Sequence, residues 1–438
     1  MIYGGDGLAR LPADSSGRGK AAFIPFVLPA EQIEALITEQ KAGFVRARAE
    51  AIIAPSSYRV APACRYFTQC GGCHYQHASY EQQLEIKKEI LRESLRRTAK
   101  IELPVEIQAH PSPPWNYRNR SRLQVQTNPS FALGYFKMAS HELLEVEECP
   151  ISSPLINRGM AALWQSGRGG QVPQGVREVE FFANADDRQL LVEISAAADA
   201  RRAALRTWAE GLRATMPEIA GVVVFRETQS RGENLQEKLL TVGAGHLIYQ
   251  TQLARYRVSA GSFFQTNRHL IDELVRIVTH GQSGELALDL YAGVGLFSAA
   301  LHDFHHTVSV ESSPTSSDDL SYNKSSNANA VLATTEQYLD RMDKSGRVRK
   351  GGSPPYMEIV HNPDLAVVDP PRSGLGERVA RKLATLGGPR VVYVSCDPVT
   401  LARDLVALLA VGYRIEQAHL VDLFPQTYHL ESVIHLAQ

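Results

Sequence analysis

The sequence predicts an α/β protein, with a doubly wound sheet at its C-terminal end preceded by a small β-barrel and a central α+β domain. Three observations support this prediction. Its 438 residues are enough for two or three domains. Short strand-like runs fill the first 55 residues, and from about residue 285 apolar strands alternate with helices. We expect domains at 1–55, 56–260 and 261–438.

The first segment has the pattern of a small barrel. The turn Gly4-Gly5-Asp6-Gly7 precedes strand-like runs at 20–28 and 44–53. Because the chain begins at this turn, we expect the barrel to lack its first strand. The segment 55–62, bounded by prolines, predicts a linker.

Composition excludes some classes of protein and favours others. A hydrophobic content of 44% and a charged content of 21% are those of a globular protein. No apolar run is long enough for a membrane helix, and the opening residues do not form a signal peptide, so we expect a cytoplasmic protein without a membrane segment.

Charge is distributed unevenly along the chain. The net charge is -1, yet residues 41–125 carry fourteen basic and seven acidic residues. Such a segment favours a polyanionic partner such as nucleic acid. The alternative is a set of solvated helix faces with Glu–Lys and Glu–Arg pairs, which suits 81–97 well.

Four of the five cysteines have the pattern of a metal site. Five residues separate Cys64 from Cys70, two separate Cys70 from Cys73, and Cys149 stands before a proline. An odd number of cysteines without a secretion signal disfavours disulfides. Four thiolates suit a [4Fe–4S] cluster, with zinc as the alternative and buried reduced cysteines as the second alternative.

The strands of the C-terminal segment end in polar residues. Apolar runs at 286–291, 307–311, 366–369 and 390–395 predict buried parallel strands. In such a sheet, ligands bind at the carboxyl ends of the strands. The stretch 344–355, rich in Gly, Ser, Lys and Arg, predicts a surface loop.

The first of these strands leads into a glycine-rich turn. In Asp289-Leu-Tyr-Ala-Gly293-Val-Gly295 the third glycine of a dinucleotide fingerprint is missing. Glu311, at the end of the next strand, is placed to bind ribose hydroxyls. Together with Asp369-Pro-Pro-Arg372 the pattern favours S-adenosylmethionine over NAD, and a simple packing turn is the alternative.

Cys396 is a candidate nucleophile. It lies in Ser395-Cys-Asp-Pro398, where the fifth strand leaves the sheet, and Glu431 stands before the last strand. Glu431 is either a base or a strand-edge charge. A thiol, a carboxylate and a methyl donor suit methylation at C5 of uracil, since the thiolate adds to C6 and activates C5 for attack.

The whole chain resembles the bacterial RNA uracil-C5 methyltransferases, which contain an iron–sulfur cluster and make 5-methyluridine in ribosomal or transfer RNA. The resemblance rests on the motifs quoted above, on Phe263-Phe-Gln265-Thr-Asn267 and on His429-Leu-Glu431. It implies a class I methyltransferase domain with a seven-stranded sheet and a barrel of the TRAM type.

The resemblance also implies roles for individual residues. Cys396 would be the nucleophile and Glu431 the proton acceptor. The residues that would line the S-adenosylmethionine site are Gln265, Tyr291, Glu311 and Asp369. The residues that would hold the [4Fe–4S] cluster are Cys64, Cys70, Cys73 and Cys149.

Other readings of the sequence stay open. A non-catalytic iron–sulfur RNA-binding protein with a relic methyltransferase domain is one, and an RNA cytosine-C5 methyltransferase is another. For the uracil enzyme we expect an RNA partner, with ribosomal RNA favoured over transfer RNA, and a monomer.

Overall fold

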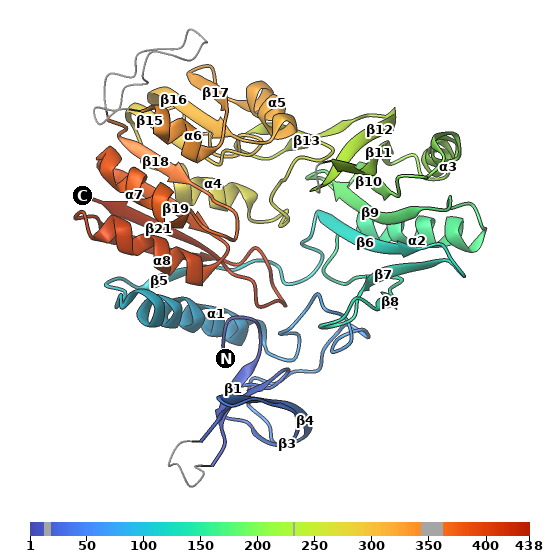
Figure 1. Cartoon of the computed structure of the whole chain (residues 1–438), viewed down its shortest axis with the longest axis horizontal. Helices are drawn as coiled ribbons and strands as arrows, with labels where there is room; N and C mark the ends of the chain where they lie inside the picture. The colour runs from blue at the N-terminus through green and yellow to red at the C-terminus, as the bar shows by residue number, and fades with distance from the viewer. Residues whose placement is uncertain (13–18, 231–232, 343–361) are drawn as a thin grey trace.

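The structure is a computed structural model that describes residues 1–12, 19–230, 233–342 and 362–438. The stretch 344–355, for which we predicted a surface loop, lies outside the described residues. Three sheets of four or more strands and one hairpin make up the described part (Figure 1). Its helices include none with the length and apolar character that crossing a membrane requires.

The N-terminal segment forms a four-stranded sheet in the order β1-β2-β4-β3. Its strands are β1 Gly7–Arg10, β2 Ala21–Ile24, β3 Gln32–Gln40 and β4 Phe44–Ala54. Alternate residues of β2 and β4 point into a small apolar core. Among the described residues, β1 and β3 are edge strands that do not pair with each other, so the sheet is open there. The small barrel, which we expected to lack its first strand, stays a prediction.

The central segment contains a seven-stranded sheet in the order β12-β11-β10-β9-β6-β7-β8. Its strands are β6 Arg120–Gln126, β7 Ala132–Phe136, β8 Leu143–Glu145, β9 Val176–Ala183, β10 Leu190–Ala196, β11 Ile219–Ser230 and β12 Glu233–Gly243. Helices α2 Pro154–Arg168 and α3 Arg202–Thr215 pack on this sheet, and both bury a tryptophan there. The hairpin of β13 His246–Gln250 and β14 Arg255–Ser259 follows.

The C-terminal segment forms a sheet in the order β17-β16-β15-β18-β19-β21-β20-β5. Its strands are β15 Gly284–Leu290, β16 Phe304–Glu311, β17 Ala328–Leu332, β18 Leu365–Val368, β19 Arg390–Ser395, β20 Arg414–Val421, β21 Glu431–Ala437 and β5 Ile107–His110. All neighbours are parallel except that β21 runs antiparallel to both β19 and β20. The doubly wound parallel sheet is thus observed, with eight strands where seven were predicted.

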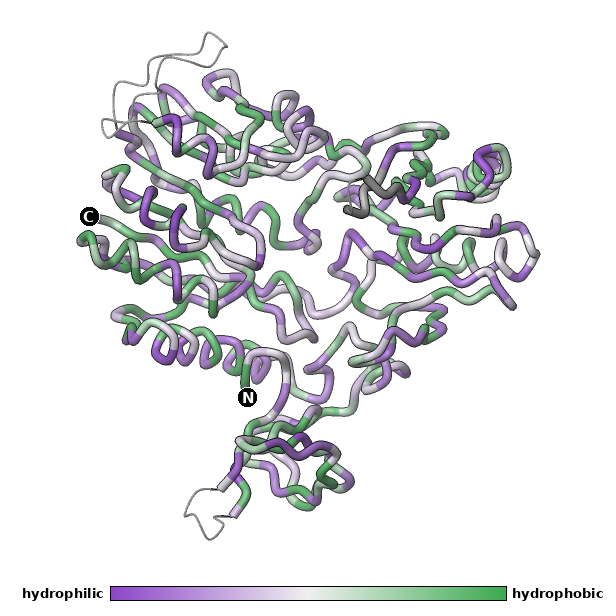
Figure 2. Tube along the Cα trace, in the orientation of Figure 1, coloured by the Kyte–Doolittle hydropathy of each residue, from purple (hydrophilic) through white to green (hydrophobic). Residues whose placement is uncertain are grey.

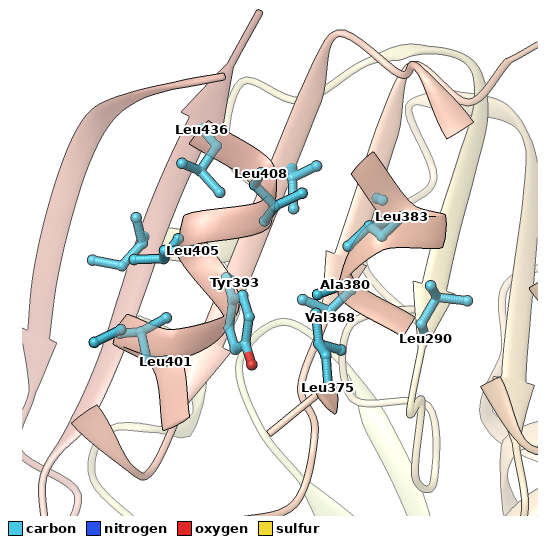
Figure 3. Packing of buried hydrophobic residues seen from close by; sticks show 14 of the residues in the cluster. Leu290, Val368, Leu375, Ala380, Leu383, Tyr393, Leu401, Leu405, Leu408 and Leu436 are labelled. Atoms are coloured by element: carbon cyan, nitrogen blue, oxygen red, sulfur yellow. The ribbon is translucent and has the colours of Figure 1, made fainter. Parts of the chain in front are cut away.

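Helices cover both faces of this sheet. They are α1 Tyr80–Ser94, α4 Ile271–Thr279, α5 Pro314–Asn323, α6 Thr335–Arg341, α7 Gly376–Leu386 and α8 Pro398–Leu409. Leu401 and Leu405 of α8 and Leu383 of α7 pack against strand residues such as Tyr393 (Figure 3). Alternate strand residues face the two sides, since Tyr393 belongs to this cluster and Val392 to the cluster on the α4 side.

The predicted central domain, residues 56–260, includes two elements that do not belong to the central sheet. Helix α1 and strand β5, which the sequence analysis assigned to the central domain, belong to the C-terminal sheet. Strand β5 pairs in parallel with β20, and Ile86, Ile90 and Leu91 of α1 enter the same core as α8. Hydrophobic and hydrophilic residues alternate along helix α1 (Figure 2), so α1 buries one apolar face and leaves most of its charges on the other side.

Helix α1 begins after Ser79, whose side chain accepts a hydrogen bond from the amide of Gln82, and it ends in the π-helical turn Leu95–Ala99. One charged residue of α1 also lies on the buried face. The Lys87 ammonium has no solvent exposure and donates to Asp422 Oδ1 at 2.6 Å, and Asp422 is equally buried. The pair therefore ties α1 to the loop after β20.

Replacing Lys87 tests this tie. We expect Lys87→Met to lower the free energy of unfolding by about 3–5 kcal/mol, because the Asp422 carboxylate would stay buried without its partner. The double variant Lys87→Met/Asp422→Leu should regain much of the loss. Urea denaturation measures both. Lys88→Met is the matched control, since its pair with the exposed Glu85 should contribute about 0.2–1 kcal/mol; an equal loss in both variants would contradict the prediction.

Candidate active site

The carboxyl ends of the parallel strands carry the residues that the sequence analysis singled out. Asp289 lies in β15, Glu311 ends β16, Asp369 follows β18 and Cys396 follows β19. Glu431 begins β21, and because β21 is antiparallel, its first residue lies at the same edge of the sheet. The register pairs Ser395 with Ser432. Cys396 and Glu431 are therefore neighbours across two adjacent strands.

The Cys396 thiol lies among charged groups. Burial, together with the negative charges of Glu431 and Asp369, raises its pKa to about 12, and the Arg372 guanidinium acts in the opposite direction. The next residue, Asp397, caps helix α8 by accepting from the amides of Val399 and Thr400. This cap fixes the turn on which the thiol stands, so that the thiol sits just before the N-terminus of a helix.

The neighbouring carboxylates share this environment. Glu431 is 3% exposed, and burial together with the negative charge of Asp369 raises its pKa well above the ordinary value. Burial and the carboxylate of Asp289 raise the pKa of Asp369 to about 7. Arg372 acts in the opposite direction on Glu431. Shifted carboxyl groups of this kind beside a thiol are typical of catalytic sites.

The turn after β15 has an unusual backbone. Tyr291 adopts a φ of +65°, which is costly for a residue with a side chain. Gly293, at φ +57°, follows, and a Cβ atom on it would meet nothing within 4 Å. Space therefore lies in front of this turn, as close approach of a ligand to the backbone requires.

Glu311 borders the same turn. Its Oε2 accepts from the amide of Gly293 at 2.9 Å, and its Oε1 accepts from the amide of Ser313 at 2.6 Å, just before α5. The Tyr291 hydroxyl interacts with Thr335, at the start of α6. Two strand ends and two helix starts thus meet at this point, as in nucleoside-binding sites of doubly wound sheets.

Asp289 lies beneath this turn and is fully buried. Its Oδ2 accepts from Ser298, whose hydroxyl lies 2.7 Å from that of Ser309, whereas its Oδ1 has no hydrogen-bond partner among the described residues. Burial raises its pKa to about 6. An unpaired buried carboxylate oxygen suits a site that receives a polar or charged ligand.

Gln265 comes from a different segment of the chain, residues 261–267. It is 5% exposed, its carbonyl accepts from Asn119, and in the described part of the chain its side-chain amide makes no hydrogen bond. Two residues later, Asn267 donates to the carbonyls of Asp422 and Leu423. The segment 261–267 is therefore joined to the loop before Glu431, while the Gln265 side chain remains free to donate to a ligand.

The structure adds residues that the sequence analysis did not find. The hydroxyl of Tyr3 donates to the carbonyl of Cys396 at 3.3 Å, and its ring packs edge-on against Tyr428 at 5.5 Å. Tyr428 in turn packs against His429, whose ring lies 3.3 Å from Arg372. Tyr3 is 393 residues from Cys396, and no local signal in the sequence predicts such a contact.

The four N-terminal cysteines gather at a second place. Cys64, Cys73 and Cys149 pack with Phe67 and Tyr117. Burial, together with the neighbouring Cys149 thiol, raises the pKa of the Cys70 thiol to about 11 and that of the Cys73 thiol to about 12. All four are free thiols. In the described ranges, no three His, Cys, Asp or Glu side chains form a group that could hold a single metal ion.

Known proteins resemble this chain over nearly its whole length. An "Uncharacterized RNA methyltransferase" of Aquifex aeolicus is 32% identical, covering 99% of this chain and 96% of its own. The 23S rRNA (uracil(1939)-C(5))-methyltransferase RlmD of Halomonas elongata is 31% identical, covering 99% and 87%.

A solved structure shares the fold. The tRNA (uracil-54, C5)-methyltransferase of Pyrococcus abyssi, in complex with S-adenosyl-L-homocysteine, aligns with a TM-score of 0.72 at 22% identity, over 99% of this chain and 100% of that one.

A family match covers most of the chain and decides between the readings that the sequence left open. The family described as tRNA (Uracil-5-)-methyltransferase matches residues 79–438. This description names uracil as the methylated base, where one alternative was a cytosine-C5 methyltransferase. It also names an enzyme, where the other alternative was a non-catalytic RNA-binding protein. The prediction of an S-adenosylmethionine-dependent RNA uracil-C5 methyltransferase is thereby confirmed: the chain belongs to the tRNA (uracil-5-)-methyltransferase family.

Proposed function

We propose that the protein methylates C5 of a uridine through a covalent bond between Cys396 and C6 of the base. The observation that supports this most is the antiparallel pairing of β19 with β21, which sets the thiol beside Glu431. In the proposed reaction the Cys396 thiolate adds to C6, and the resulting enolate attacks the methyl group through C5. The sulfonium of S-adenosylmethionine loses that methyl group and leaves as S-adenosylhomocysteine.

Glu431 completes the cycle. The C5 proton passes to its carboxylate, the electrons of the C5–H bond restore the double bond, and the thiolate leaves C6. Because its pKa is raised, the Glu431 carboxylate is a stronger base than an ordinary carboxylate, which favours it as the acceptor of this proton. The Cys396 thiol is mostly protonated at neutral pH, with its pKa near 12, so Arg372, which lowers that pKa, supports the thiolate that begins the reaction.

The methyl donor would lie along the strand ends. Glu311 would accept hydrogen bonds from the ribose hydroxyls of the donor, and the space in front of Gly293 would admit the amino and carboxyl groups of its methionine part. Tyr291, Asp369 and the free amide of Gln265 would supply the remaining polar contacts. S-adenosylmethionine carries the activated methyl group, while the protein holds the methyl donor and the uracil ring in line.

Two substitutions at the reacting groups separate the steps. Cys396→Ala should lower methylation by at least about a thousandfold, because C5 is then not activated, while S-adenosylmethionine binding stays within about threefold. Glu431→Gln should leave methyl transfer intact and trap a protein–RNA adduct, because the C5 proton cannot leave. A denaturing gel with labelled RNA detects that adduct. Turnover by Cys396→Ala would refute the covalent mechanism, and absence of the adduct in Glu431→Gln would assign the base to another residue.

For the substrate, we propose ribosomal RNA in preference to transfer RNA. Support comes from relatives called 23S rRNA methyltransferases, which match nearly the whole chain at 31% and 29% identity. The cytoplasmic location and the monomeric state remain predictions.

Transcripts of ribosomal RNA and transfer RNA, offered with labelled S-adenosylmethionine, distinguish the two substrates. We expect kcat/KM for methylation of ribosomal RNA to exceed that for transfer RNA by at least about tenfold. This ratio corresponds to a difference of about 1.4 kcal/mol in transition-state free energy. Preferential labelling of transfer RNA would overturn this choice of substrate.

We also propose that Cys64, Cys70, Cys73 and Cys149 hold a [4Fe–4S] cluster, with zinc as the alternative. The mutual electrostatic effects of the thiols support a shared ligand. Each thiolate of such a cluster bonds a different iron, so the sulfur atoms are farther apart than around one ion. That no group suited to a single metal ion is found among the described residues is compatible with such a spacing.

Removing one thiol tests the cluster. Cys70→Ser should lose the broad visible absorbance and the four irons per chain expected of anaerobically purified protein, and should unfold at a lower urea concentration, since metal binding is coupled to folding. Cys396→Ser, which changes the fifth cysteine, should keep the iron. One zinc per chain in place of iron would contradict the cluster and leave the methyl-transfer proposal unaffected.

A further inference from the structure

The loop 422–430 connects β20 to β21 and ends at Glu431. Among the described residues it has few backbone hydrogen bonds of its own, namely those from Leu423 to Val421 and from Thr427 to Phe424. At its middle, Gln426 has a φ of +69°, which turns its peptide groups away from the regular path of the chain. Distant segments therefore determine where this loop lies.

The cysteine-rich segment supplies the first of these contacts. The amides of His74 and Tyr75, which directly follow Cys73, both donate to the carbonyl of Gln426 at 2.9 Å. The ring of His74 also packs against that of Tyr428, with centroids 4.6 Å apart. The position of the loop thus depends on the backbone next to a proposed cluster ligand.

Helix α1 supplies the second set of contacts. Gln83, which is 1% exposed, accepts from the amide of Gln426 at 2.9 Å and donates to the side-chain oxygen of Gln426 at 3.0 Å. A further bond from Gln83 to the carbonyl of Ala78 orients its amide group. Buried amide pairs of this kind have a defined geometry, because each unmade bond leaves a polar group without a partner.

Two more bonds hold the neighbouring carbonyls. Lys87 donates to the carbonyl of Phe424 at 2.9 Å, and the Tyr117 hydroxyl donates to that of Pro425 at 3.0 Å. Three successive carbonyls, those of residues 424 to 426, are therefore held by groups from α1, from the cysteine-rich segment and from the connection between β5 and β6. Glu431 follows five residues after Gln426, at the end of this externally held stretch.

We propose that Gln83 is a positioning residue for Glu431, and that its contact with Gln426 links the cysteine-rich segment to the catalytic base. This inference rests on the proposed function, since it takes Glu431 as the proton acceptor. Gln83 lies outside the reacting groups and acts through the loop. A small displacement of the base slows proton removal much more than it weakens substrate binding. The link is also reciprocal, so loosening Gln426 exposes the cysteine-rich segment.

The test compares Gln83→Met with a control of similar structural cost. Methionine keeps the length of the side chain and removes its three hydrogen bonds. Trp208→Phe is the control: it removes a buried hydrogen bond between α3 and Ser166 of α2, beside the seven-stranded sheet and away from the loop. We expect Gln83→Met to lower kcat at least about tenfold with KM for RNA within twofold, and to accumulate the protein–RNA adduct. Trp208→Phe should change neither.

Amide hydrogen exchange gives a readout that does not depend on activity. In Gln83→Met, exchange of residues 422–431 and of 73–78 should be at least about tenfold faster than in the unmodified chain, and in Trp208→Phe it should be unchanged there. Gln426→Gly, which suits the positive φ and removes only the side chain, should give an intermediate effect. It also serves where Gln83→Met does not fold.

The outcomes separate the two proposals. A lower urea midpoint for Gln83→Met, with kcat, adduct and exchange all equal to those of the control, would overturn the positioning role. Faster exchange at 422–431 without faster exchange at 73–78 would overturn the link to the cysteine-rich segment. If Glu431→Gln forms no adduct, the proton acceptor is another residue, and the proposed role of Glu431 fails. The positioning of residue 431 is then decided by the exchange data alone.

Discussion

The antiparallel direction of β21 is the constraint on which the active site depends. In a fully parallel sheet the first residue of this strand would lie at the opposite edge from Cys396. Because β21 is inserted antiparallel between β19 and β20, Glu431 begins at the edge where β19 ends. The same pairing buries the carboxylate, and burial is the main cause of its raised pKa.

This arrangement concentrates negative charge in a region of low exposure. Asp289, Asp369 and Glu431 each raise the pKa of a neighbour, and Arg372 opposes them for Cys396 and Glu431. Like charges held together out of water destabilise the folded state, so the site is kept at the expense of stability, as at many catalytic sites. The apolar clusters on both faces of the sheet supply the offsetting free energy.

Helix α1 and strand β5 precede the central sheet in the sequence but complete the C-terminal domain. Strand β5 extends the sheet, and α1 packs on the same face as α8. The buried pair of Lys87 and Asp422 and the hydroxyl of Tyr3 reach the loops that carry the reacting groups. Segments with many basic residues are therefore in direct contact with the loops that carry the proposed reacting groups.

The sequence by itself determined what depends on local pattern: the strands of the doubly wound sheet, and the residues at their ends, including Tyr291, Glu311, Asp369 and Cys396. These follow from apolar runs that stop at polar residues, and the family motifs identify the chemistry. Only the tertiary structure decided that β5 and α1 join this sheet, that β1 to β4 form an open sheet, and that Gln83 meets Gln426 across 343 residues. Such contacts depend on how distant surfaces pack, and no spacing within one segment encodes them.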